Sequence, residues 1–129
     1  MDRRYIEGTW EQGRAFSPAV IVKGGTTVFV AGHGAFVDEQ GKSLAGDFEA
    51  QTRQSFRNIE ATLKRAGASL KDLVTMTVFI CDSRHGARFT ELRREIFGRD
   101  FPASALITCA GFARPEMMVE IQAIAVIDA

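Results

Sequence analysis

Glu120 is the titratable residue with the most unusual surroundings in this sequence. It lies in the apolar stretch Met117–Ile127 (MMVEIQAIAVI), which predicts a long β-strand whose alternate residues point to opposite faces. On its own face Glu120 would have a single polar neighbour, Gln122, among apolar residues. A carboxylate in such a place costs several kcal/mol unless it is paired, hydrogen-bonded or protonated. Two interpretations therefore stand: a structural partner of an arginine or an edge position, or a general acid or base in a pocket.

Arg114, Gly32 and His33 are further candidates for a binding site. Pro115 restricts Arg114 to an extended backbone, and a rigid arginine near a strand end can hold a carboxylate through two parallel hydrogen bonds. The alternative is an exposed arginine in a turn. Gly32, in the run AGHG, either lets a ligand approach the backbone closely or marks a β-bulge. His33 could titrate or bind a substrate, although a single histidine more often only forms hydrogen bonds.

Several other kinds of chemistry are not indicated. His85 has no histidine or cysteine near it at ligand spacing, so we expect no metal site. The sequence has no phosphate-binding glycine loop or nucleophile elbow, and its hydroxyl residues have no paired histidine. Cys81 and Cys109 each lie in an apolar run, which predicts small core residues in a reducing compartment rather than a disulfide.

Length and composition predict one globular domain over residues 1–129, because 46% of the residues are hydrophobic and 25% are charged. The 16 basic residues equal the 16 acidic ones, so nothing favours a nucleic acid, whose binding depends on phosphate neutralisation. No signal-peptide core or membrane-spanning run occurs, so we expect a cytoplasmic protein without a membrane partner. The densest basic cluster is interleaved with acidic residues, which indicates a solvated helix face. It consists of Arg84, His85, Arg88, Arg93 and Arg94.

The first half of the chain predicts strands followed by a helix. A short edge strand is expected at Arg3–Glu7, and Gly24–Gly25 separate Ala19–Lys23 from Thr27–His33 in a pattern typical of a β-hairpin. A polar loop at Val37–Gly46 precedes an amphipathic helix. The predicted apolar stripe and caps of this helix are Thr52, Phe56, Ile59, Leu63 and Ala66, with Asp47 as N-cap and Gly67 beyond the last turn.

The second half predicts a strand, a helix and two further strands. Leu73–Asp82 is largely apolar on both faces, which indicates a central strand. Ser83 is expected to cap a second helix that ends at Gly98, and strands follow at Ala103–Gly111 and Met117–Ile127. Two amphipathic helices and about six strands predict an α+β domain with both helices on one face of a mixed sheet. The other face would stay apolar and uncovered, which predicts self-association.

The order and spacing of several motifs resemble the RidA/YjgF family, also called L-PSP. The motifs are TVFVAGHG, QTRQSFRNIEATLKRAG, TVFICD, FPAS and VEIQAIAV, and the resemblance covers nearly the whole chain from Ser17 onward. It implies a chorismate-mutase-like fold and a homotrimer whose sheets pack into a central barrel, with sites in the clefts between subunits. It also implies hydrolysis of reactive enamines and imines, such as 2-aminoacrylate, to 2-keto acids and ammonia, without a metal or organic cofactor.

The resemblance assigns roles to individual residues. Glu120 matches the glutamate that orients and activates the hydrolytic water, and Gly32 matches the glycine whose backbone borders the ligand. The pocket wall would consist of Phe16 and Ser17 in a closing N-terminal segment, Phe89 and Thr90 on the second helix, and Leu106. At the position of the arginine that clamps the substrate carboxylate in the family, this sequence has Ser104.

The exchange at Ser104 changes the expected function. A charge-assisted bidentate pair is worth roughly 2–5 kcal/mol, against roughly 1 kcal/mol for one neutral hydrogen bond. We therefore expect an enamine or imine deaminase, or a related hydrolase, with altered specificity for a small metabolite, in which Arg114 or else His33 holds the substrate. The alternative is a non-catalytic trimeric protein that binds a small ligand. The balanced charge disfavours an RNA-directed role as an endoribonuclease or translation inhibitor.

Overall fold

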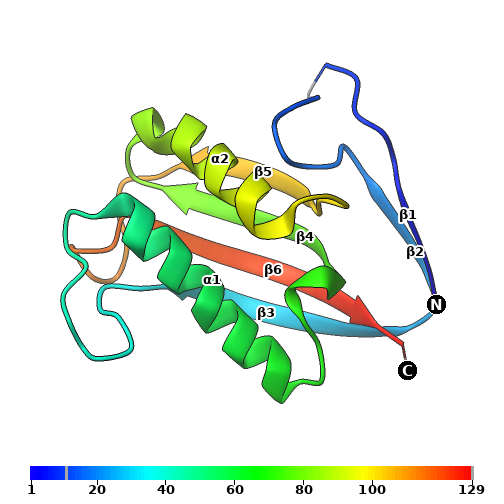
Figure 1. Ribbon diagram of the computed structural model, residues 1–129, viewed down its shortest axis with the longest axis horizontal. Helices are drawn as coiled ribbons and strands as arrows, with labels where there is room; N and C mark the ends of the chain where they lie inside the picture. Colours follow the sequence, from blue (N-terminus) through cyan, green and yellow to red (C-terminus); the bar gives the residue numbers. More distant parts are fainter. Residues whose placement is uncertain (11, 129) are drawn as a thin grey trace.

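In the computed structural model, which describes residues 1–10 and 12–128, a four-stranded sheet carries two α-helices on one face (Figure 1). The helices are α1 (Phe48–Arg65) and α2 (Gly86–Phe97), with two short 3-10 helices, η1 (Leu70–Asp72) and η2 (Ser83–His85). In spatial order the strands are β3 (Thr26–Gly34), β6 (Val119–Ile127), β4 (Leu73–Ile80) and β5 (Ala103–Thr108). β4 and β5 are parallel and the other neighbours antiparallel, so the predicted mixed sheet beneath two helices is confirmed.

Helix α1 has the predicted caps, and the predicted stripe is buried from Thr52 to Leu63, whereas its last member, Ala66, is exposed at the C-cap. The Asp47 side chain accepts a hydrogen bond from Ala50 N at 3.0 Å and thereby satisfies one of the free amides of the first turn. Gly67, at a φ of 79°, follows the last turn in the left-handed conformation. The buried apolar residues of α1 that join the core are Phe48, Phe56, Ile59 and Leu63.

The N-terminal strands β1 (Asp2–Tyr5) and β2 (Val20–Lys23) form a separate two-stranded ribbon, so the six strands are divided between two sheets. The predicted hairpin of β2 with β3 is wrong, because β2 pairs with β1 and β3 pairs with β6. Gly24 and Gly25, at φ values of 78° and 87°, turn the chain at a corner instead. Figure 1 shows the ribbon leaving the sheet beside the C-terminus, where Arg3 Nη2 donates to the Val126 carbonyl at 2.6 Å.

The chain enters α2 through a different cap from the one predicted. The Asp82 carboxylate, rather than Ser83, accepts a hydrogen bond from Arg84 N at 2.9 Å and caps η2, from which α2 continues. The Arg84 guanidinium also donates to Asp82 at 2.7 Å, and these hydrogen bonds lower the pKa of Asp82 to about 2. The end of α2 at Gly98, with a φ of 74°, is as predicted.

The two faces of the four-stranded sheet differ in what covers them. Beneath the helices, residues such as Val78 and Ile121 are fully buried. Paired residues of neighbouring strands share a face, so Phe79 lies with Glu120 and Ile107 on the opposite side. We call this side the open face; it carries Phe29, Phe79, Ile107, Glu120 and Ile124. Phe29 is 79% exposed there, although phenylalanine is normally buried.

Candidate functional site

Glu120 and Gly32 lie together on neighbouring strands at the open face. The pairing of β3 with β6 is irregular between Val30 and His33, and this bulge brings Gly32 against the Glu120 side chain. A Cβ atom built on Gly32 would lie 2.8 Å from Glu120 Oε2, so a larger residue would displace the carboxylate. Among the residues that the structure describes, Glu120 forms no ion pair or side-chain hydrogen bond. No arginine of the same chain therefore neutralises it.

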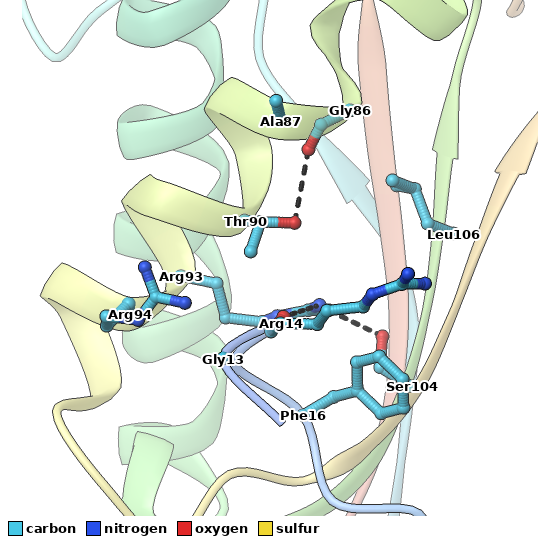
Figure 2. A pocket seen from close by; sticks show the side chains of 10 residues that line it. All are labelled: Gly13, Arg14, Phe16, Gly86, Ala87, Thr90, Arg93, Arg94, Ser104 and Leu106. Atoms are coloured by element: carbon cyan, nitrogen blue, oxygen red, sulfur yellow. Dashed lines mark hydrogen bonds between the residues drawn. The ribbon is translucent and has the colours of Figure 1, made fainter. Parts of the chain in front are cut away.

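A second group of predicted residues lines a cavity of about 420 Å³ between α2, the start of β5 and the loop at residues 13–16 (Figure 2). We call this cavity the α2 pocket. It brings together four residues that the sequence predicts for one site, namely Phe16, Thr90, Ser104 and Leu106. The other lining residues are Gly13, Arg14, Gly86, Ala87, Arg93 and Arg94.

Arg93 extends through the α2 pocket from the helix toward β5. Only 2% of its surface is exposed, and its Nη1 donates a 2.6 Å hydrogen bond to Ser104 Oγ (Figure 2). Nη2 donates to the Arg14 carbonyl at 3.2 Å, whereas the buried Nε has no hydrogen-bond partner in the described chain. The guanidinium carbon lies 5.2 Å from the ring centre of Phe89 and 5.7 Å from that of Phe16, within the range of cation–π attraction.

The prediction that Arg93 belongs to a solvated basic face is wrong. Arg93 follows the buried Phe89 by four residues, which places both on the same side of α2. Arg88, on the outer side, instead pairs with Glu49 of α1. The spacing from Phe89 was the available signal for burial, but the sequence does not show that the end of this long side chain reaches Ser104.

The positive charge of the α2 pocket has no acidic counterpart among the residues that the structure describes. No residue in the described ranges forms an ion pair with Arg93, and none of the residues that line the pocket is acidic. Burial lowers the pKa of Arg93 to about 10, which still leaves the guanidinium charged at neutral pH. Arg14 and Arg94 add two exposed cations to the lining. The arrangement attracts an anion.

Three other predicted wall residues have distinct roles. Phe89 is fully buried and lies beneath Arg93 in the core rather than on the pocket surface. Ser17 Oγ donates to the Phe101 carbonyl at 2.6 Å, which fastens the N-terminal loop beside the start of β5. The Thr90 hydroxyl donates to the helix backbone at 3.2 Å, so its oxygen can still accept a hydrogen bond from a ligand.

Arg114, the predicted replacement for the missing arginine, lies at the other end of β5. It follows this strand in the chain, whereas Ser104 is near the start of the strand. Its guanidinium carbon lies 3.8 Å from the centre of the Phe36 ring, and its Nη2 is 3.5 Å from Glu116 Oε2. These contacts stabilise the turn, and the cation beside Ser104 is Arg93 instead.

His33, the second predicted replacement, faces the helices. Its Nε2 lies 2.8 Å from Thr62 Oγ1 of α1 and its Nδ1 lies 2.7 Å from the Ala31 carbonyl. Since a carbonyl can only accept, Nδ1 carries the proton and His33 connects β3 to α1. Both ring nitrogens thus have partners within the chain.

The two cysteines are half-buried and free, rather than core residues. Cys81 and Cys109 follow the paired ends of β4 and β5, and burial raises the pKa of the Cys81 thiol. In residues 1–10 and 12–128 no three His, Cys, Asp or Glu residues gather so that they could hold a metal ion. The same residues include no helix long and apolar enough to cross a membrane.

Glu120 and the α2 pocket are separated by the sheet itself. Ser104 pairs with Met76, which is buried beneath the helices, whereas Glu120 pairs with Phe79 on the open face. β4 also lies between β5 and β6, which adds roughly 10 Å across the strands. One chain therefore cannot bring Glu120 and Arg93 to the same small ligand.

Comparison with known proteins agrees with this fold. A family model described as Endoribonuclease L-PSP matches residues 11–127. A RutC family protein of Pyrococcus abyssi is 36% identical over 104 residues, which are 81% of this chain and 81% of that protein. The chain belongs to the RidA/YjgF family.

Solved structures of RidA/YjgF proteins have the same architecture. The crystal structure of the Rid family protein YyfB of Yersinia pestis, whose function is unknown, superposes with a TM-score of 0.86 at 28% identity, covering 98% of this chain and 100% of that one. RidA of an Antarctic Psychrobacter gives a TM-score of 0.72 at 30% identity, covering 96% and 99%. The fold of this RidA/YjgF protein is therefore the predicted chorismate-mutase-like α+β fold.

Proposed function

We propose that this RidA/YjgF protein hydrolyses small enamines or imines and releases ammonia. The site lies between the subunits of a homotrimer, where Glu120 and Gly32 of one subunit face the α2 pocket of the next. The observation that carries this proposal is the Glu120 carboxylate, which lies against Gly32 without an ion-pair partner in the described chain and is free to take a proton from water. The proposal includes a cytoplasmic location, which the two free cysteines support.

The reaction needs one water molecule and one group that moves protons. An enamine is first protonated on carbon to give the protonated imine. Glu120 accepts a proton from water while the water oxygen attacks the C=N carbon, and an amino alcohol forms. Glu120 then returns the proton to nitrogen, the C–N bond breaks, and the remaining hydroxyl proton leaves with the ammonia. Protonated imine and water thus give a carbonyl compound and ammonium, and Glu120 recovers its charge.

The open face supports assembly into a trimer. Phe29 is 79% exposed and Ile107 is 42% exposed on this face, while the opposite face is covered by α1 and α2. An apolar sheet face of this kind is typically buried against another copy of the chain. Packing three open faces together would cover Phe29. It would also bring Glu120 to the edge of a neighbouring subunit. A shared site needs such a contact, because Glu120 and Arg93 of one chain lie on opposite faces of the sheet.

The name of the matching family model raises RNA cleavage as a second function. The chain carries 16 acidic and 16 basic residues, so it has no net positive charge to bind phosphates. His33, a candidate for acid–base catalysis on RNA, is engaged with Thr62 and Ala31. We therefore include RNA in the test as a control substrate.

Glu120→Gln tests the proposed function, because the amide keeps the shape of the side chain and cannot take a proton. Ammonia release is measured from freshly generated 2-aminoacrylate and from the imine of 2-oxobutyrate, above the uncatalysed rate. We expect kcat to fall by about a hundredfold or more in the variant. Glu39→Gln, on an exposed loop, is the matched control and should keep full activity. A wild-type protein that leaves both rates at the uncatalysed level, or an RNase activity that requires Glu120, would rule the proposal out.

A further inference from the structure

The proposed reaction assigns no role to the buried guanidinium of Arg93, which has no carboxylate partner among the described residues. Arg93 is 2% exposed and lacks an ion pair within the described residues, although removing a charge from water is costly. Two half-buried arginines of the same region do have acidic partners: Arg88 pairs with Glu49, and Arg53 pairs with Glu95 at 2.9 Å. A buried cation that faces a cavity in this state is suited to an anion from outside the chain.

We propose that Arg93 binds the carboxylate of the substrate, in place of an arginine at position 104. The α2 pocket is then the specificity subsite for small imines and enamines that carry a carboxylate next to the C=N carbon. This inference rests on the proposed function and names the substrate class of the same site.

The hydrogen bonds of Arg93 leave donors for such a ligand. A guanidinium has five N–H groups, and two of them are used, on Ser104 Oγ and on the Arg14 carbonyl. The buried Nε has no partner in the described chain, and one further N–H remains on each terminal nitrogen. A carboxylate can therefore bind along one edge of the guanidinium through two parallel hydrogen bonds.

The surroundings hold Arg93 in place before a ligand arrives. The ring centres of Phe16 and Phe89 lie 5.7 and 5.2 Å from the guanidinium carbon of Arg93, and its Nη2 donates a hydrogen bond to the Arg14 carbonyl. These contacts immobilise the long side chain of Arg93 in the empty pocket. Binding of a ligand therefore costs less side-chain entropy.

Ser104 would donate a further hydrogen bond to the carboxylate of the ligand, and its small side chain leaves room for Arg93. Its oxygen accepts from Arg93 Nη1 at 2.6 Å, so its own proton is free to point at a carboxylate oxygen. An arginine at position 104 would place a second guanidinium beside the first, where like charges repel. Ser104 is thus the small, neutral residue that lets a cation reach this place from α2.

Arg93 could instead be purely structural, since it ties the loop at residues 13–16 to α2 and β5. A structural role and a binding role predict different results for ligands of different charge. A collapsed loop would impair neutral and anionic ligands alike. A lost carboxylate clamp would impair only the anionic ones.

The test compares Arg93→Gln and Arg93→Lys with the wild type on two matched substrates, the imine of 2-oxobutyrate and the imine of its uncharged amide. We expect Arg93→Gln to raise KM for the anionic imine by roughly 30-fold or more, to leave KM for the amide nearly unchanged, and to change kcat much less than Glu120→Gln does. Arg93→Lys should lie between the two. Arg88→Gln, on the outer side of α2, is the control and should behave as the wild type does.

Thermal stabilisation by sodium 2-oxobutyrate, a ligand that needs no turnover, separates this inference from the proposed function. In 2-oxobutyrate the melting temperature of the wild type and of Arg88→Gln should rise, while that of Arg93→Gln should stay unchanged. If no imine is hydrolysed but this pattern appears, the proposed function fails and the carboxylate subsite stands. If imines are hydrolysed and Arg93→Gln loses anionic and neutral substrates equally, the subsite is refuted and the proposed function stands.

A sharper version of the same test moves the arginine from position 93 to position 104. Ser104→Arg alone should weaken the binding of 2-oxobutyrate, because two guanidinium groups then crowd one pocket. The double variant Arg93→Gln/Ser104→Arg should bind more tightly than either single variant, which is a coupling between the two positions. Simple additivity of the two substitutions would show that the residues do not share a ligand and would overturn the inference.

Discussion

Each face of the four-stranded sheet has a charged residue without a counter-charge in the described part of the chain, but the two residues lie in different surroundings. Arg93 lies beneath α2 in a cavity, fixed by Ser104, the Arg14 carbonyl and aromatic rings. Glu120 lies on the open face, where only the absence of a side chain at Gly32 makes room for it. The first is a rigidly held cation in a cavity, and the second is a half-buried carboxylate.

In the proposed function, this difference separates substrate binding from proton transfer. A carboxylate beside Arg93 would form an ion pair and lose its capacity as a base, because the pair would lower its pKa. The sheet prevents such a pair within one chain, since Ser104 and Glu120 lie on opposite faces. In the proposed trimer the two groups meet only across a cleft, with the substrate between them.

The largest expected effect comes from removing the assembly that joins the two faces. Phe29→Asp places a charge on the open face, on the edge strand β3, where a neighbouring subunit of the proposed trimer would have to desolvate it. Sedimentation should show monomers in place of trimers, and the activity should fall to the level of Glu120→Gln. Phe29→Leu should keep both assembly and activity. A folded monomer with full activity would show that a single chain suffices.

Gly32→Ala tests the position of Glu120 without touching its chemistry. The added Cβ atom would come within 2.8 Å of Oε2, and a flexible carboxylate will move away rather than unfold the sheet. We expect kcat to fall by roughly tenfold to a hundredfold, because a displacement of about 1 Å is costly for a reacting group. The melting temperature should stay nearly constant. In a Glu120→Gln background Gly32→Ala should have no further effect on kcat, and an additive loss would contradict this explanation.

Mixing two impaired variants tests whether the two faces belong to different subunits of one site. The anionic imine is supplied far below its KM, where Arg93→Gln turns over little substrate. Glu120→Gln and Arg93→Gln subunits, denatured and refolded together, form some clefts that contain an intact Glu120 from one chain and an intact Arg93 from another. Random assembly into trimers should restore about a quarter of the wild-type sites. The same mixture without refolding is the control and should keep only the low activity of the two separate variants. A refolded mixture without activity would place both groups in one subunit.

The sequence predicted the local features better than the long-range ones. Asp47 and Gly67 end α1 as expected, because capping depends on neighbouring residues. The predicted hairpin at Gly24–Gly25 does not form, because strand pairing depends on partners elsewhere in the chain. Here β2 pairs with β1, and β3 pairs with β6. A glycine pair indicates a turn but not what the turn joins.

The candidate site shows the same limit. The family motifs pointed to Glu120 and Gly32, which lie together on neighbouring strands, and to Ser104, which lines the α2 pocket. Arg93 was missed because its backbone lies on a helix with a charged outer face, while the guanidinium ends at another element. Long side chains separate the position of a residue from the place where it acts.

The smallest expected effect is a pH dependence that distinguishes the buried cation from the exposed groups. Burial lowers the pKa of Arg93 from its ordinary value to about 10, so the folded chain gives up this proton at a lower pH than the unfolded chain does. The destabilising contribution of the buried charge is therefore complete below about pH 10 and is relieved as the pH rises above it. Binding of 2-oxobutyrate should move in the opposite direction and weaken as the pH passes about 10, because the clamp loses its charge. Isothermal titration and thermal melts between pH 8 and 11, with Arg93→Gln as the reference for all other titrations, measure both trends. Binding that stays constant through about pH 10 would show that the charge of Arg93 is not what holds the ligand.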